Sequence, residues 1–172
     1  RKGASNIIDC KWVLKWKWEQ DQVSIEASVA STTKVTRRRI IRARLTVRGF
    51  KDVGKGNVDT YAGTSARYSQ RIVCSQAVLR DWDLCTSDVS KAFLQGITYE
   101  ELSQMTGEPI REVNFYLPAY NIPQLRQVPG FEHFDPNTEV CHCDKPGTGS
   151  VDAPRCFSIQ LSNATKVAGL VS

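Results

Sequence analysis

Asp88 is the residue of this 172-residue chain whose type and setting best suit chemistry. It lies near the end of a short predicted strand, residues 84–89, and a tight turn, Lys91–Gly96, follows at once. A Mg²⁺ ion takes one or two carboxylates together with water and phosphate oxygens. The segment therefore suits a metal-holding carboxylate, and the alternative is an aspartate that caps the next helix.

Other segments with reactive side chains carry weaker signals. Residues 147–150, Gly-Thr-Gly-Ser, precede a predicted helix and could bind phosphate through backbone N–H groups, but the lysine of a full phosphate-binding loop is missing. Cys141-His142-Cys143 lacks the second ligand pair of a zinc site. Neither His133 nor His142 has a convincing Ser or Cys nucleophile partner, so hydrolase triads are unsupported.

Two stretches near the N-terminus alternate with a period of two, which predicts strands. In residues 11–18 one face holds Trp12, Leu14, Trp16 and Trp18, and the other holds Lys11, Val13, Lys15 and Lys17. In residues 38–48 one face holds Ile41, Ala43, Leu45 and Val47, and the other holds Arg38, Arg42, Arg44, Thr46 and Arg48. We expect an antiparallel hairpin with one basic face, closed by a long polar loop over residues 19–36.

The charge distribution agrees with that hairpin. The whole chain has a formal net charge of +5, from 23 Lys and Arg against 18 Asp and Glu. Residues 1–50 carry 12 basic and 4 acidic side chains, a balance of +8, whereas residues 51–172 carry 11 and 14, a balance of −3. A strand-ordered basic face indicates an anionic partner such as nucleic acid or nucleotide phosphates, and the alternative is a solvated face.

The rest of the chain alternates helices and strands, which predicts an α+β fold with a mixed or antiparallel sheet. The expected helices cover residues 65–80, residues 99–105 up to Gly107, and a C-terminal segment with Asp152 as N-cap and Pro154 in its first turn. The expected strands are residues 84–89, 112–117 and 140–144, and residues 122–134 should be irregular. The residues expected to be buried are Ile72, Val73, Ala77 and Leu79 of the first helix and Phe157, Leu161, Ala164 and Ala168 of the last.

Several classes of protein are disfavoured. No apolar run reaches the roughly 18 to 20 residues of a membrane-spanning helix. The chain starts Arg1-Lys2-Gly3 without an initiator Met or a following apolar region, so we expect a piece of a longer reading frame without a signal peptide. The six cysteines are then expected to be reduced, buried thiols of an intracellular protein.

Five segments, taken in order, resemble motifs of copia-type (Ty1/copia, Pseudoviridae) retrotransposon reverse transcriptases. The first joins Lys11-Trp12-Val13 and Lys15 to Arg42-Ala43-Arg44-Leu45 and Arg48-Gly49-Phe50, which resemble the family's K-W-V-x-K and K-A-R-L-V-x-x-G-F. The other four are Asp59-Thr60-Tyr61 (E-T-F in the family), Asp88–Gly96 (D-V-K-T-A-F-L-N-G), Val128–Phe131 (Q-P-x-G-F) and Gly149–Phe157 (G-L-K-Q-A-P-R-A-W). Each motif alone is weak, whereas the ordered set is specific.

The resemblance implies a right-hand polymerase, an RNA-directed DNA polymerase, of which this chain covers the fingers (hairpin, residues 7–50) and the first part of the palm (residues 80–172). Asp88 would be the first catalytic carboxylate and would hold two Mg²⁺ ions, one of them also bound by the Val89 carbonyl. Arg42 and Arg44 would contact the incoming dNTP or the template, and Phe93 would pack under the sugar of the dNTP. The implied template and primer contacts are Lys15, Arg48, Gly149, Pro154 and Arg155.

The resemblance also implies partners and a place in the cell. They are an RNA or DNA template–primer, a dNTP, and the flanking integrase and RNase H modules of a Pol polyprotein, with no membrane. The protein would lie in the cytoplasm or in a virus-like particle.

Several departures from the family pattern stand out. Asp152 replaces a glutamine and would put a negative charge near the template, and Ala62-Gly63 replaces Ser-Pro. The connection between residues 96 and 128 is long and carries residues 99–117. The second metal motif, Tyr/Phe-x-Asp-Asp, is absent, because no Asp-Asp dipeptide occurs in the 172 residues. We therefore expect this fragment alone to be inactive, and the alternative is a degenerate or co-opted remnant that binds nucleic acid without catalysis.

Overall fold

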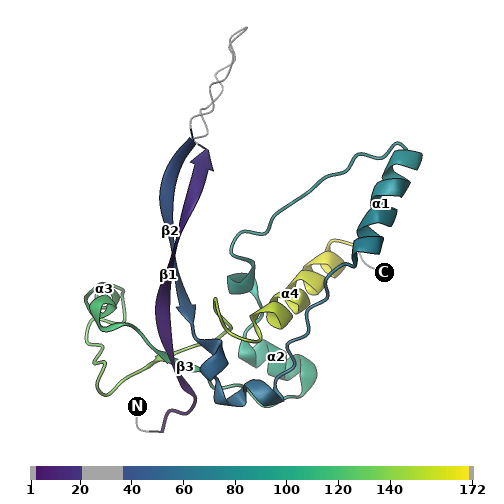
Figure 1. Ribbon diagram of the computed structural model, residues 1–172. Helices are drawn as coiled ribbons and strands as arrows, with labels where there is room; N and C mark the ends of the chain where they lie inside the picture. The colour runs from purple at the N-terminus through teal and green to yellow at the C-terminus, as the bar shows by residue number, and fades with distance from the viewer. Residues whose placement is uncertain (1–2, 21–36, 171–172) are drawn as a thin grey trace.

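The computed structural model describes residues 3–20 and 37–170, so most of the predicted loop over residues 19–36 lies outside the described residues. Two long strands form a ribbon that projects from a mixed body of helices and short strands (Figure 1). The strands are β1 Ile7–Gln20, β2 Arg37–Val47, β3 Asn114–Tyr116 and β4 Cys141–His142. The α-helices are α1 Arg67–Leu79, α2 Tyr99–Thr106, α3 Ile122–Leu125 and α4 Ala153–Val167, with short 3-10 turns η1 Gly49–Lys51, η2 Val53–Asn57, η3 Ala92–Gln95 and η4 Ala119–Asn121.

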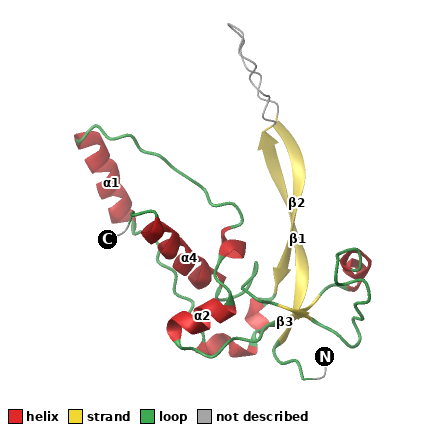
Figure 2. Ribbon diagram, turned by 180° about the vertical axis from the view of Figure 1, so that it is seen from behind, coloured by secondary structure: helices red, strands yellow, loops and turns green. Residues whose placement is uncertain are grey.

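The predicted hairpin is confirmed, with both of its faces. Strands β1 and β2 pair antiparallel, with Trp16 opposite Ile41 and Lys15 opposite Arg42. Residues that lie opposite each other share a face, so the tryptophans fall on the apolar side and the lysines on the basic side. Beyond its base the ribbon stands clear of the body in both views (Figures 1 and 2), and Leu14, Trp16 and Trp18 are each 62% exposed.

The hairpin continues into a mixed four-stranded sheet with the order β2-β1-β3-β4. Strand β3 pairs parallel to the first residues of β1, with Ile7 opposite Asn114, and antiparallel to β4. The main core cluster lies at this base and consists of Ile8, Cys10, Val47, Tyr99, Val113 and Cys143. The sequence-based prediction of an α+β fold with a mixed sheet and with strands in residues 112–117 and 140–144 is therefore confirmed.

Helix α2 follows directly from local sequence. The Thr98 side chain accepts a hydrogen bond from the Glu101 backbone N–H, and the Glu101 carboxylate accepts one from the Thr98 backbone N–H, which is a capping box. Gly107 ends the helix with a φ of 74°, a left-handed conformation that glycine adopts without steric cost. The predicted helix and its end are both confirmed.

The predicted strand over residues 84–89 is wrong. These residues form no strand, and every residue from 81 to 91 is exposed on a segment that connects α1 to η3 (Figure 1). A strand persists when a neighbouring strand takes its N–H and C=O groups, and none of the strands within residues 3–20 and 37–170 pairs with this segment. The local pattern was compatible with a strand, but no strand of the described residues pairs with it.

The buried faces predicted for the two long helices are also wrong. Helix α1 lies where predicted, but it stands apart from the sheet (Figure 1), so Ile72, Val73 and Leu79 are exposed and only Ala77 is buried. Helix α4 begins at Ala153 with Pro154 in its first turn, as predicted. Its buried residues are Ala153 and Cys156, while Phe157 is half-buried and Leu161, Ala164 and Ala168 are exposed. Periodicity marked both helices without revealing what each one packs against.

Three smaller expectations have mixed outcomes. The segment over residues 122–134 is irregular except that it opens with the short helix α3. Cys10, Cys141, Cys143 and Cys156 are buried free thiols, and burial raises the pKa of Cys156 to about 11, whereas Cys74 and Cys85 are exposed. Within the described residues no helix is long and apolar enough to cross a membrane.

Two glycines far apart in the sequence join the hairpin to the start of α4. The Gly49 N–H donates to the Gly149 carbonyl at 3.2 Å, and the Val47 N–H donates to the Thr148 carbonyl at 2.9 Å. A Cβ on Gly49 would lie 2.2 Å from the Gly149 oxygen, and one on Gly149 would lie 2.2 Å from the Val47 oxygen. Gly149 also has a φ of +95°. Backbone approach this close is open only to glycine at both positions.

Gly49→Ala should destabilise the fold by about 2–3 kcal/mol, because the added methyl group must push the two backbones apart. Gly56→Ala is the matched control, since a Cβ there meets nothing within 4 Å, and it should change stability by less than about 0.5 kcal/mol. Urea unfolding of the three proteins measures the difference. Equal midpoints for the two variants would contradict the close approach of Gly49 and Gly149.

Candidate nucleic-acid interface

The basic side of the hairpin, which we call the cationic face, gathers six exposed cations. They come from alternate positions of both strands: Lys11, Lys15, Lys17, Arg38, Arg42 and Arg44. Glu19 also lies on this face, and its carboxylate pairs with Arg38 at 3.0 Å. The sequence-predicted residues Lys15, Arg42 and Arg44 thus lie together, because pairing places Lys15 opposite Arg42 and Val13 opposite Arg44.

This face carries an electrostatic cost that an anion would relieve. Like charges directly opposite each other on a two-stranded sheet destabilise it, and Lys15 and Arg42 are such a pair. Both side chains are exposed, so an approaching phosphate can contact them without unfolding anything. The arrangement suits the phosphates of a nucleic acid, which neutralise several cations at once and release counterions.

On the other side of the hairpin, the apolar face, the tryptophans make contacts within the protein. The Arg39 guanidinium lies over the Trp16 ring at 4.6 Å and the Trp18 ring at 5.8 Å, near the end of the described ribbon. Trp12 donates from its indole N–H to the Asn121 side chain at 2.9 Å, which ties the lower ribbon to the segment before α3. Cation–π contact thus holds Arg39 on the aromatic rings of this face.

Arg48, predicted as a template contact, lies at the hairpin base instead of on the open part of the ribbon. Its guanidinium and the Lys51 ammonium each pair with the Asp9 carboxylate at 3.0 Å. The hydrogen bond from Lys51, with the charge of Arg48, holds the pKa of Asp9 below its ordinary value. Arg48 therefore has a carboxylate partner already.

The turn after Asp88 packs on α4. A Cβ on Gly96 would lie 3.1 Å from backbone atoms of Cys156 and Phe157, so this glycine lets the chain pass close to the helix. The Ile97 N–H donates to the Cys156 carbonyl at 3.4 Å. The Phe93 and Phe157 rings meet edge to face, with centroids 6.4 Å apart. Phe93 is thus held next to the last residue of the Gly149–Phe157 motif.

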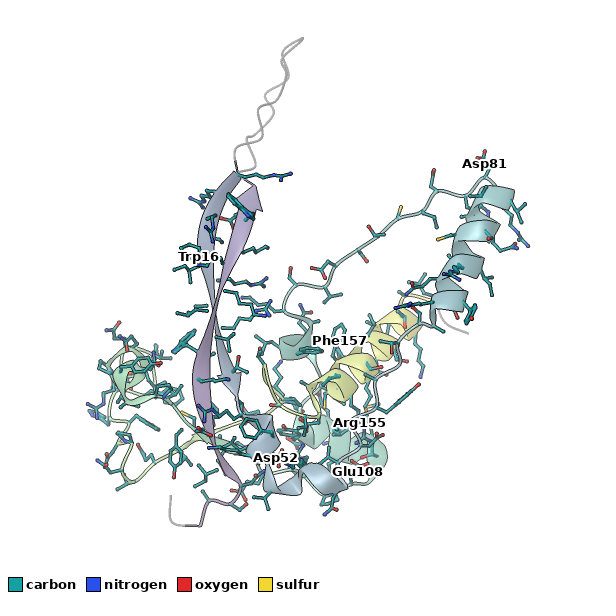
Figure 3. The ribbon with its side chains drawn as sticks, viewed as in Figure 1. Trp16, Asp52, Asp81, Glu108, Arg155 and Phe157 are labelled. Atoms are coloured by element: carbon teal, nitrogen blue, oxygen red, sulfur yellow. The ribbon has the colours of Figure 1, made fainter. Side chains whose placement is uncertain are left out.

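Arg155, another predicted template contact, is engaged by two carboxylates. Its guanidinium forms a two-point pair with Glu108, at 3.0 Å for each bond, and lies 3.6 Å from Asp59. Figure 3 shows Glu108 and Arg155 near each other beside α4. Hydrogen bonds from Arg155 lower the pKa of Glu108. The contact between Arg155 and Asp59 also brings the Asp59-Thr60-Tyr61 segment to α4.

Arg111, Asp52 and Asp152 form a buried charge cluster that was not predicted from the sequence. Arg111 donates to both carboxylates, and Tyr99 donates from its hydroxyl to Asp152 at 3.5 Å. Asp152 occupies the N-cap position, as predicted, but its side chain makes no capping hydrogen bond. The residue is fully buried, which raises its pKa in spite of Arg111, and it points to that arginine and not to an outer surface. In the sequence, the signal for this cluster was that Asp152 stands where the family pattern has a glutamine.

Asp88 and Val89 are exposed on the connecting segment between α1 and η3. In the described part of the chain no group of three or more His, Cys, Asp or Glu side chains is arranged to hold a metal ion. Among the described residues, Asp88 therefore belongs to no such group of potential metal ligands. Pro154 is half-buried in the first turn of α4, and the Gly149 carbonyl is taken by the hairpin.

The comparisons with known proteins point to retrotransposons. The chain is 26% identical over 167 residues to the retrovirus-related Pol polyproteins from transposons RE1 and RE2 of Arabidopsis thaliana. The match covers 96% of this chain and 9% of each of those polyproteins, so the chain spans a small part of their length. No protein-family model and no solved structure matches the chain. The similarity supports a segment of a retrotransposon Pol polyprotein.

Arg42→Ala should weaken binding of the chain to an RNA oligonucleotide and lower the slope of log K against log salt by about 0.7, because one phosphate contact is lost. Lys166→Ala, an exposed cation on α4, is the control and should leave the slope unchanged. Fluorescence anisotropy over a salt series measures both. Binding by the wild-type chain without salt dependence would count against the cationic face.

Glu108→Gln should make the chain less sensitive to acid. The pKa of Glu108 is lowered in the folded state from an ordinary value of 4.5, so its contribution to stability is complete above about pH 4.5 and is lost as the pH falls below it. Thermal midpoints of wild type and variant should therefore differ most near neutral pH and converge towards pH 3. Glu100→Gln, at an exposed position of α2, serves as the control. A constant difference across the series would contradict the Arg155 pair as its cause.

Proposed function

We propose that this chain is the fingers and first palm segment of an RNA-directed DNA polymerase of a copia-like retroelement, which performs two-metal nucleotidyl transfer in the complete protein. One observation carries the proposal: four of the five motif segments converge on the start of α4. Gly49 contacts Gly149, Asp59 pairs with Arg155, and Gly96 packs on Cys156 and Phe157. Similarity to Pol polyproteins over 96% of the chain supports it.

The cationic face supplies the electrostatic part of this function. Phosphoryl transfer needs positioning and charge neutralisation more than a protein nucleophile. Arg42 and Arg44 would neutralise the phosphates of the incoming dNTP, and Lys15, opposite Arg42, would contact the template–primer. Long flexible cations on a rigid ribbon can follow a phosphate backbone, which supports RNA or DNA as the partner.

The metal would bind at Asp88. A carboxylate and the neighbouring Val89 carbonyl are the hard oxygen ligands that Mg²⁺ prefers, and their exposed segment leaves room for water and phosphate oxygens. When bound, two Mg²⁺ ions would activate the primer hydroxyl and stabilise the leaving pyrophosphate. Asp88 would hold them in part, and further carboxylates must come from outside these residues. Phe93, supported by Phe157, would contact the sugar.

The remaining roles belong to the same proposal. Gly149, Pro154 and Arg155 would border the template, with Arg155 oriented by Glu108. Arg48 would reach the template–primer from the hairpin base, beside Asp9. Integrase and RNase H modules would flank the segment, as parts of one Pol polyprotein.

A second candidate is a remnant that binds nucleic acid without catalysis. It is favoured by the isolation of Asp88, since the described residues offer no cluster of metal ligands around it. The two candidates share the cationic face and differ in whether Asp88 contributes to any reaction. An extension assay therefore separates them, whereas a binding assay does not.

Asp88→Asn should abolish Mg²⁺-dependent primer extension, by about 10³-fold or more, in a protein that contains this chain and the reading frame that follows it. Asp83→Asn is the matched control, because Asp83 is an exposed carboxylate on the same segment and should be dispensable. Extension on an RNA template with labelled dNTP measures both.

Full activity of the Asp88→Asn protein would remove Asp88 from the mechanism. A downstream reading frame without a Tyr/Phe-x-Asp-Asp motif, together with no extension by the wild type, would leave the non-catalytic candidate.

A further inference from the structure

Arg111 bridges two parts of the molecule that are far apart in the sequence. One guanidinium nitrogen donates to Asp52 and another to Asp152. The Arg111 side chain is 14% exposed, that of Asp52 3% and that of Asp152 0%, so the cluster is shielded from water. The Arg111 guanidinium also lies over the Tyr99 ring at 5.6 Å. Planar, two-point pairing of this kind fixes direction as well as distance.

Asp52 belongs to the base of the hairpin. It follows β2 by five residues, and its carboxylate accepts hydrogen bonds from the Gly54 N–H at 2.9 Å and from the Asn6 side chain at 3.1 Å. Asn6 directly precedes β1, and its own side-chain oxygen accepts from the Val53 N–H at 3.1 Å. The Asp52 carboxylate is therefore connected to the chain before and after the ribbon. Figure 3 places Asp52 at the foot of the two strands.

Asp152 belongs to α4, which begins at the next residue. The Cys156 N–H donates to the Asp152 carbonyl at 3.0 Å, so the backbone of Asp152 is part of the first helical turn. Its side chain receives Arg111 and the Tyr99 hydroxyl. Because Arg111 donates to both aspartates, it links the hairpin base to the start of α4.

A second attachment between these two parts is made by the backbone. It includes the hydrogen bonds from Val47 to Thr148 and from Gly49 to Gly149, two neighbouring bonds on one short stretch of chain. Two adjacent bonds resist separation but leave rotation about the line that joins them. The buried Arg111 cluster joins the same two parts through different residues.

We infer that Arg111 is a positioning residue that sets the orientation of the hairpin, and with it the cationic face, relative to α4. This positioning gives a role to the long connection over residues 99–117, which supplies both Tyr99 and Arg111. The consequence for nucleic-acid binding rests on the proposed function, whereas the orientation itself does not. The buried Asp152, in the place of a neutral residue, provides the second anchor that Arg111 holds.

The test is a distance measurement between the ribbon and α4. Spin labels are placed at Lys17→Cys on β1 and Gln160→Cys on α4, both exposed positions, in a background where the exposed Cys74 and Cys85 are replaced by serine. The four remaining cysteines are buried, and burial raises the pKa of Cys10 to about 12 and that of Cys143 to about 11, so they label slowly. Pulsed electron–electron double resonance then measures the distribution of label-to-label distances.

The decisive variant is Asp52→Asn, Arg111→Met and Asp152→Asn together. Arg111→Met alone would leave two buried, unpaired carboxylates and could fail to fold, whereas the triple variant removes the bridge and the charges at once. We expect a shifted and broadened distance distribution at temperatures where circular dichroism is unchanged. Glu108→Gln is the control, because it breaks an ion pair to α4 from the same connection without touching the hairpin base, and its distribution should match that of the background.

An unchanged distribution in the folded triple variant overturns the inference, and so does an equal shift in Glu108→Gln. A loss of stability without a change in distance means that the cluster is structural only. Binding of an RNA oligonucleotide is measured on the unlabelled proteins. If the wild-type chain does not bind it, the proposed function fails, while the distance result still decides the role of Arg111.

Discussion

The close approach of two backbones at the hairpin base is the constraint on which the rest of the structure depends. Because neither Gly49 nor Gly149 has a Cβ, the end of β2 can lie directly against the loop before α4 and donate backbone hydrogen bonds to it. The core cluster at this base, with Ile8, Val47 and Val113, forms around the contact. The turn at Gly96 and the Asp59 segment both contact α4, so the same backbone contact also fixes their positions relative to the hairpin.

Charge is distributed in two ways that serve different ends. On the ribbon, cations such as Lys15 and Arg42 lie exposed and opposite each other, an arrangement that costs stability until an anion binds. At the base, Arg111 and Arg155 are each shared by two carboxylates and are largely shielded. The exposed set is suited to an external polyanion, and the shielded set connects segments of the chain. Residue type alone does not separate the two sets, since arginine occurs in both.

Much apolar surface remains uncovered. Trp16 on the apolar face of the ribbon and Ile72 and Leu79 of α1 are open to solvent. No strand among the described residues lies beside the segment that carries Asp88. Uncovered apolar surface of this extent is typical of a protein–protein contact.

The sequence by itself determined the features that arise within a few residues: the alternation of β1 and β2, the capping box at Thr98 and Glu101, and the order of the motifs. Those features follow from strand and helix periods and from local hydrogen bonds, which act between near neighbours. Only the tertiary structure decided that Arg155 and Arg111 are engaged by carboxylates, that Asp152 is buried instead of capping α4, and that residues 84–89 form no strand. Each of these depends on a partner dozens of residues away, and pattern in one segment carries no information about which distant segment will meet it.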